Sequence, residues 1–169
     1  MQTLVIYDSK FGNTEKVAGA IARGAGPVSE VRITTAAEAA RAIEALFARP
    51  DLVLVGGPTQ NRGPSAGLRG FVDSLPEALR GIRTACFDTR YRGPTWLMGS
   101  AAAVVTRALA KSGAEVVAPP ESFFIVRRGA TPLRVLEPGE IERAESWGRA
   151  IATSARDSER VGLTADITR

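Results

Sequence analysis

A loop near the N-terminus, residues 9–14, reads Ser-Lys-Phe-Gly-Asn-Thr and has the chemistry of an anion-binding loop. Ser9, Asn13 and Thr14 carry short side chains that donate hydrogen bonds, and Gly12 allows the backbone to turn tightly. A helix that begins here directs its first N–H groups, and the positive end of its dipole, toward a ligand above it. The residue types and their spacing therefore predict a phosphate site. The alternative is a capped turn between a strand and a helix that binds no ligand.

The chain lacks several other kinds of reactive site. The loop does not have the Lys-Ser/Thr ending of a nucleotide P-loop, and no Gly-x-Gly-x-x-Gly dinucleotide motif is present. There is no histidine, which excludes Ser-His-Asp and Cys-His nucleophile systems and metal sites built on imidazole. Cys86 is the only cysteine and lies in an apolar run, so we expect a small buried side chain. Catalysis by this chain would therefore depend on a cofactor.

The elements that must position the loop alternate between short apolar runs and helical stretches. The predicted strands are residues 3–7, 28–33, 51–55 and 82–87, followed by an interrupted strand at 116–117 and 123–126. The predicted helices run from Asn13 or Thr14 to about Arg23, from 35 to just before Pro50, over 68–74 with Ser65 as cap, from Ser100 to Gly113, and over 137–154. Five such units predict an α/β fold with a doubly wound, five-stranded parallel sheet of order 2-1-3-4-5.

This topology also predicts where a ligand binds. In a doubly wound sheet, ligands bind beyond the carboxyl ends of the strands, at the switch point between the first and third strands. The loops at that edge are residues 8–14, 56–67 and 88–99. No linker divides the chain, so we expect one domain over residues 1–155 and a polar C-terminal tail, 156–169, that frays.

The first loop closely resembles the phosphate signature of the flavodoxin family: a hydroxyl residue, any residue, an aromatic residue and Gly-Asn-Thr, after a buried strand. The resemblance implies a flavodoxin-like three-layer sandwich that binds FMN, with the 5′-phosphate in this loop and the flavin ring between the other two loops. The cofactor-binding residues that it indicates are Ser9, Lys10, Phe11, Gly12, Asn13, Thr14, Pro58, Thr59, Gln60, Asn61, Arg62, Gly63, Asp88, Thr89, Arg90, Tyr91, Arg92 and Gly93. Tyr91 is the candidate for stacking on the ring; the alternative is a surface tyrosine that packs locally.

Two features depart from the family pattern. Many flavodoxins have a Trp or Tyr in the second loop, whereas none occurs here between residues 51 and 70. Typical carriers are acidic near the flavin, but this chain places five basic residues around the predicted site: Lys10, Arg62, Arg69, Arg90 and Arg92.

The basic residues allow two interpretations. In the first, Arg62, Arg90 and Arg92 stabilise the reduced flavin or attract an anionic ligand, such as NAD(P)H or an acidic redox partner. In the second, they form ion pairs with Asp73, Asp88 and helix termini in water, with little energetic effect.

Composition limits the partners of the chain. The formal net charge is +4, but the arginines are scattered without a basic run, which argues against nucleic-acid binding. No apolar run approaches the ~20 residues needed to cross a bilayer, and no signal-peptide pattern precedes the first strand. We therefore expect a cytoplasmic monomer or homodimer with no nucleic-acid or membrane partner.

Three functions remain open. The first is an electron carrier that shuttles electrons between redox partner proteins. The second is an FMN-dependent oxidoreductase that takes hydride from NAD(P)H and passes electrons to a quinone-type acceptor. The third is a binding module that keeps the fold without stable flavin.

Overall fold

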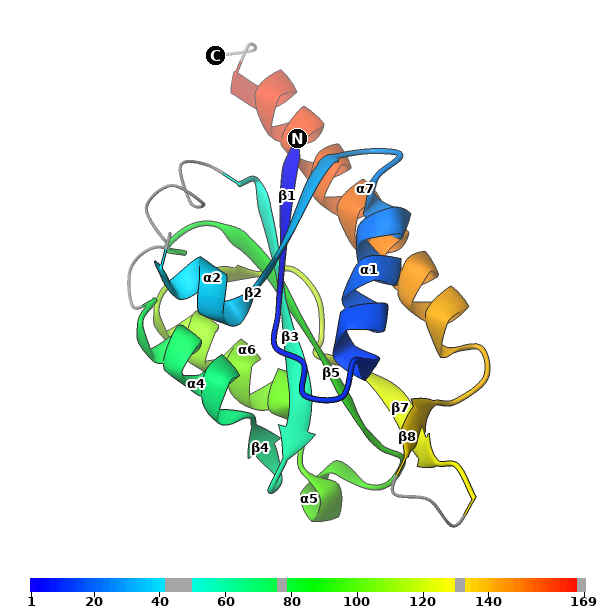
Figure 1. Cartoon of the computed structure of the whole chain (residues 1–169). Coiled ribbons are helices and arrows are strands. Elements are labelled where there is room, and N and C mark those ends of the chain that lie inside the picture. The colour runs from blue at the N-terminus through cyan, green and yellow to red at the C-terminus, as the bar shows by residue number, and fades with distance from the viewer. Residues whose placement is uncertain (42–49, 76–78, 130–132, 167–169) are drawn as a thin grey trace.

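A mostly parallel sheet forms the middle layer of the computed structural model, which describes residues 1–41, 50–75, 79–129 and 133–166 (Figure 1). The strands follow the order β2 (Glu30–Thr35), β1 (Gln2–Tyr7), β3 (Leu52–Gln60), β5 (Arg83–Tyr91), β7 (Glu121–Arg127) and β8 (Arg134–Leu136). Two short strands lie off this path: β4 (Gly63–Pro64) pairs with β3, and β6 (Glu115–Val116) pairs with β5. Strands β2, β1, β3, β5 and β7 pair in parallel, so the predicted order 2-1-3-4-5 is confirmed.

The sheet contains the five predicted parallel strands and additional strands, because it continues into β8. This short strand pairs antiparallel with β7, with Val126 opposite Val135. Three residues are too few to show a clear alternation of apolar and polar side chains, so the sequence pattern did not indicate a strand here.

Strands β3 and β5 are longer than the sequence predicts. The apolar runs end at residues 55 and 87, but the two strands stay paired through Gly57 with Asp88 and Pro58 with Thr89. The glycines here serve close packing rather than a turn: a Cβ at Gly56 would lie 2.3 Å from the ring of Phe87. Much of the second and third predicted loops is therefore strand.

Helices cover both faces of the sheet. In Figure 1, α1 (Asn13–Ala25) and α7 (Glu140–Asp166) lie on one side, and α2 (Ala36–Arg41), α4 (Ala66–Asp73) and α6 (Ala101–Lys111) lie on the other. The short helix α5 (Thr95–Met98) lies at the carboxyl edge of the strands. Helix α7 continues to Asp166, so residues 156–166 extend this helix where the sequence suggested a frayed tail. The expected second helix reaches residues 42–49, which lie outside the described residues.

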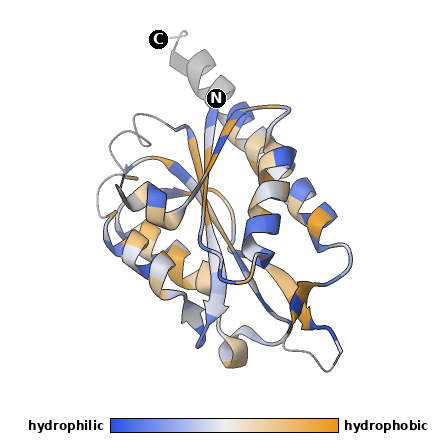
Figure 2. Cartoon of the chain, viewed as in Figure 1, coloured by the Kyte–Doolittle hydropathy of each residue, from blue (hydrophilic) through white to orange (hydrophobic). Residues whose placement is uncertain are grey.

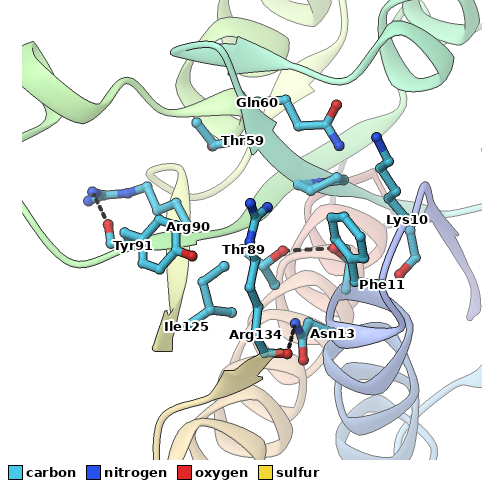
Figure 3. A pocket seen from close by; sticks show the side chains of 13 residues that line it. Lys10, Phe11, Asn13, Thr59, Gln60, Thr89, Arg90, Tyr91, Ile125 and Arg134 are labelled. Atoms are coloured by element: carbon cyan, nitrogen blue, oxygen red, sulfur yellow. Dashed lines mark hydrogen bonds between the residues drawn. The ribbon is translucent and has the colours of Figure 1, made fainter. Parts of the chain in front are cut away.

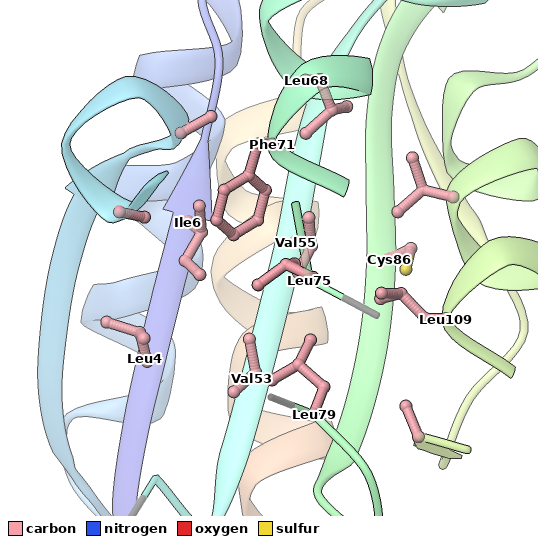
Figure 4. Packing of buried hydrophobic residues seen from close by; sticks show 14 of the residues in the cluster. Leu4, Ile6, Val53, Val55, Leu68, Phe71, Leu75, Leu79, Cys86 and Leu109 are labelled. Carbon is pink, nitrogen blue, oxygen red and sulfur yellow. The ribbon is translucent and has the colours of Figure 1, made fainter. Parts of the chain in front are cut away.

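Alternating strand residues divide the core into two clusters. Leu4 and Ile6 of β1 face α4 and α6, where they join a cluster that includes Phe71 and Leu109 (Figure 4). Val5, between them, belongs to the cluster beneath α1 and α7. Figure 2 shows hydrophilic residues on the outward-facing parts of α1, α2 and α7. Each fully buried aliphatic or aromatic side chain contributes about 1.5–3 kcal/mol, so both clusters hold the strands in register.

The predicted small buried side chain at Cys86 is confirmed, and the ring of Trp147 packs against the core. Cys86 is 1% exposed, and burial raises the pKa of its thiol to about 12, so the thiol stays protonated at neutral pH. Trp147 packs edge-to-face against Phe87 and Phe123, with ring centroids 6.2 and 6.3 Å away. None of the described helices is long and apolar enough to cross a membrane.

Candidate functional site

A cavity of about 410 Å³, including the part open to solvent, lies at the carboxyl ends of β1, β3 and β5 (Figure 3). Its walls come from all three predicted loops and from the β7–β8 hairpin: Ser9, Lys10, Phe11, Asn13, Thr14, Pro58, Thr59, Gln60, Thr89, Arg90, Tyr91, Ile125 and Arg134.

The first turn of α1 forms one end of this cavity. Gly12 is the N-cap residue, with φ of +77°, a left-handed conformation that a glycine adopts without strain. Gly12 has no side chain to cap the helix, and within the described part of the chain the backbone N–H groups of residues 11–14 donate no hydrogen bond. The expectation that Asn13 or Thr14 is the cap is therefore wrong, because both are already helical. The helix end presents free donors and a positive dipole to the cavity.

Asn13 and Thr14 use their side chains to connect α1 to other elements. The Asn13 amide donates to the backbone carbonyl of Arg134, at 3.0 Å, which attaches the β7–β8 hairpin to the helix. The hydroxyl oxygens of Thr14 and Thr89 lie 2.8 Å apart in a buried hydrogen bond. When Thr89 is the donor, the Thr14 proton is free to point into the cavity.

Ser9 adds a further hydroxyl to this end of the cavity. Its oxygen accepts a hydrogen bond from the N–H of Glu15, at 3.3 Å. Its own proton remains available to an acceptor, because a hydroxyl both donates and accepts. Together, the free N–H groups and the hydroxyls of Ser9 and Thr14 form a set of donors suited to an anion.

Only part of the second predicted loop, Pro58, Thr59 and Gln60, lines the cavity. Thr59 donates to the carboxylate of Asp88 at 3.0 Å and accepts from the N–H of Ala101 at 2.8 Å, so internal bonds occupy its hydroxyl. Asn61 and Arg62 form the turn into β4, with φ of +46° and +67°. They line an outer groove rather than the inner cavity. Gly63 is buried within β4 and lines neither.

The carboxylate of Asp88 lies in the interior of the protein. Asp88 is fully buried, and its Oδ2 accepts from Ser100 at 2.7 Å and from the N–H of Ala102 at 3.0 Å. These bonds fix the N-terminus of α6 to β5. The sequence indicated Asp88 as a cofactor-binding residue, but the structure gives it a role within the fold.

The arginines of the third predicted loop have partners within the protein. Arg90 is 7% exposed and borders the cavity. Its Nε donates to the hydroxyl of Ser122 at 2.9 Å and lies 3.9 Å from the carboxylate of Asp88. Arg92 pairs with Glu137 at 2.6 Å and is not among the residues that line the cavity. Its guanidinium stacks over the ring of Phe124, 4.0 Å from the centroid. The pairing expected with Asp88 is thus present, and Arg92 and Gly93 do not line the cavity.

An outer groove of about 1150 Å³, including open solvent, continues from the cavity toward α5. It shares Lys10, Phe11, Tyr91 and Arg134 with the cavity and adds Asn61, Arg62, Leu97 and Met98. Sequence reasoning missed Ile125, Arg134, Leu97 and Met98. The only local signal is weak: Gly129 offers a turn, and Leu133, Val135 and Leu136 follow it with Arg134 among them.

The arrangement suits a ligand with a phosphate at one end and a planar ring at the other. The donors lie at the α1 end, and the rings of Phe11 and Tyr91 flank the remaining space (Figure 3). Among the described residues, no group of His, Cys, Asp and Glu side chains is arranged to hold a metal ion.

Comparison with known proteins supports the fold. The flavodoxin family model matches residues 5–147. A flavodiiron protein from Giardia intestinalis has a TM-score of 0.74 and 15% identity, over 92% of this chain and 36% of that chain. A flavodoxin from the domain Archaea has a TM-score of 0.74 and 19% identity, over 92% and 99% of the two chains. A WrbA-like flavodoxin from Agrobacterium tumefaciens has a TM-score of 0.69 and 19% identity, over 92% and 98%. No curated protein matches the chain.

Proposed function

This chain belongs to the flavodoxin family, and from that premise we propose that it binds FMN and carries electrons between redox partner proteins. Membership of this family implies a flavin cofactor. The choice of FMN rests on the end of α1, where free N–H groups and the hydroxyls of Ser9 and Thr14 lie at one cavity. A phosphate there gains charge-assisted hydrogen bonds, each worth about 1.5–3 kcal/mol.

The rest of the cavity fits a flavin ring. Tyr91 lies at the end of β5 on one side, and Phe11 lies on the other (Figure 3). Phe11, from the first loop, supplies an aromatic surface that the second loop lacks. Pro58 and Ile125 add apolar walls, which exclude water from the ring.

The chemistry of the reaction comes from the cofactor, since a bound flavin supplies one- and two-electron transfer. The residues of this chain bind and orient it: the first loop holds the phosphate, and Tyr91 and Phe11 enclose the ring. The open outer groove leaves one route to the ring for a partner protein. We propose a cytoplasmic location, in keeping with a single buried cysteine.

A second function, direct oxidation of NAD(P)H, is favoured by one observation. The outer groove next to the ring site is lined by four basic residues, Lys10, Arg62, Arg90 and Arg134. A nicotinamide nucleotide is anionic, and a groove of positive charge raises its local concentration.

Anaerobic stopped-flow mixing of the FMN-loaded chain with NADPH and with NADH distinguishes the two functions. A carrier is expected to keep its oxidised absorption spectrum for minutes and to lose it only when a reductase is added. Prompt bleaching by the nucleotide alone, saturating with its concentration, would identify the oxidoreductase and contradict the carrier.

The hydrogen bond between Thr14 and Thr89 leads to a prediction about affinity. We expect Thr89→Val to raise the Kd for FMN about fivefold to tenfold, because the hydroxyl that orients the Thr14 proton is lost, at a cost of about 1 kcal/mol. Quenching of flavin fluorescence measures this Kd. Thr84→Val, in the same strand and equally buried but far from the cavity, is the matched control. Equal Kd values for the two variants would contradict the role given to Thr89.

A further inference from the structure

Arg134 reaches the cavity from an element that the phosphate signature does not include. It begins β8, and its backbone carbonyl is held by the side chain of Asn13 at 3.0 Å. Its side chain extends from there into the space between Tyr91 and Phe11 (Figure 3). The guanidinium carbon lies 5.1 Å from the Phe11 ring centroid and 5.9 Å from that of Tyr91. Two cation–π contacts thus hold a positive charge between these two side chains, within reach of a ligand bound in the cavity.

The charge of Arg134 differs from those of Arg90 and Arg92 because no acid among the described residues compensates it. Arg92 is paired with Glu137, and Arg90 lies beside Asp88. Within the described residues, no carboxylate forms an ion pair with the Arg134 side chain. A guanidinium without an ion-pair partner is available to a charged ligand. At a partly enclosed site this interaction is less screened by water than the interaction within an exposed ion pair.

The position of Arg134 indicates the ring rather than the phosphate as its target. The phosphate donors Ser9, Asn13 and Thr14 line only the inner cavity, whereas Arg134 lines both the cavity and the outer groove. It also touches the two aromatic rings that flank the proposed ring site.

Resting on the proposed function, we propose that Arg134 contacts the flavin ring and makes the site bind reduced, anionic FMN more tightly than oxidised FMN. Two electrons and one proton added to the oxidised ring leave a net negative charge on it at neutral pH. The guanidinium attracts this charge, and the oxidised ring offers no equivalent charge. Differential affinity of this kind raises the midpoint potential of the bound cofactor.

The test compares the two-electron midpoint potential of FMN bound to the wild-type chain, Arg134→Gln, Arg134→Lys and Arg92→Gln. In Arg134→Gln, the preference for reduced over oxidised FMN is expected to fall about tenfold, which lowers the potential by about 30 mV for a two-electron couple. Arg134→Lys keeps the positive charge and is expected to retain most of the preference. Arg92→Gln is the matched control, because it removes an arginine that is paired with Glu137 outside the cavity.

Three outcomes would overturn the inference. The first is an unchanged potential in Arg134→Gln, and the second is an equal fall in Arg92→Gln. The third is an equal loss of affinity for both redox states of FMN with no loss for riboflavin, which would make Arg134 a phosphate contact. A wild-type chain that binds no flavin would overturn the proposed function as well, whereas flavin binding with unchanged potentials overturns this inference alone.

Discussion

Replacing Ser9 by Asp is expected to weaken FMN binding by at least about 100-fold while leaving the chain folded. Ser9 is half-buried beside the free N–H groups of α1, so a carboxylate there takes the place of the phosphate. The carboxylate accepts hydrogen bonds from the N–H groups at the end of the helix. It also repels the phosphate at close range, by about 3 kcal/mol at a partly buried site. The free energy of unfolding should stay the same or rise slightly, because an acid at a helix N-terminus is favourable by about 0.3–1 kcal/mol.

Titrations with FMN and with riboflavin separate the electrostatic effect from a change of shape. Ser9→Asn, neutral and close in size to Asp, is the matched control and should cost much less FMN affinity. Riboflavin has no phosphate, so Ser9→Asp should leave its Kd nearly unchanged. A similar loss for both flavins would mean that the variant disturbs the ring site, and the phosphate would then lie elsewhere.

Replacing Gly24 by Ala is expected to lower the free energy of unfolding by about 3 kcal/mol or more. Helices α1 and α7 cross with their backbones in contact: a Cβ at Gly24 would lie 1.9 Å from the carbonyl oxygen of Glu145. A Cβ at Gly148 would lie 2.3 Å from the carbonyl oxygen of Ile21. Because backbone atoms cannot rotate away, the helices must separate and loosen the cluster beneath them.

Gly19→Ala in the same helix is the control for Gly24→Ala. Its Cβ would meet only the flexible side chain of Arg23, at 3.7 Å, and alanine gains up to about 1 kcal/mol of helix propensity. Urea unfolding followed by circular dichroism should show Gly19→Ala at or above the wild-type stability and Gly24→Ala well below it. Equal stabilities for the two variants would contradict backbone contact between α1 and α7.

Much of the fold could be predicted because its signals are local. The runs at residues 3–7 and 51–55 are apolar on both sides, as strands covered by two helical layers must be. The order of the parallel strands followed from the number of strand–helix units and their handedness. The first loop was recognisable because its donor residues and its glycine lie within one short segment, residues 9–14.

The third loop shows why other site residues could not be assigned. Residues 88–91 are strand, so successive side chains point to opposite faces of the sheet. Thr89 reaches Thr14 beneath α1, whereas Asp88 reaches the N-terminus of α6. A segment interpreted as loop has no such alternation, and Asp88 therefore seemed equally available to a ligand.

Long-range contacts account for the rest of the differences. Asn13 and Arg134 are distant in the sequence, and only the β7–β8 hairpin brings them together. The pairing of Arg92 with Glu137 likewise depends on the chain that follows β8. Neither contact leaves a pattern in the sequence around the residue itself.

The most direct measurement of the central claim is a pair of titrations of the purified chain, one with FMN and one with riboflavin, followed by absorbance near ~450 nm and by fluorescence. If the end of α1 holds the phosphate, FMN should bind at least about 100-fold more tightly than riboflavin. Equal affinity for the two flavins would contradict a phosphate site in the first loop. Saturation by neither would mean that the chain keeps the flavodoxin fold without stable flavin.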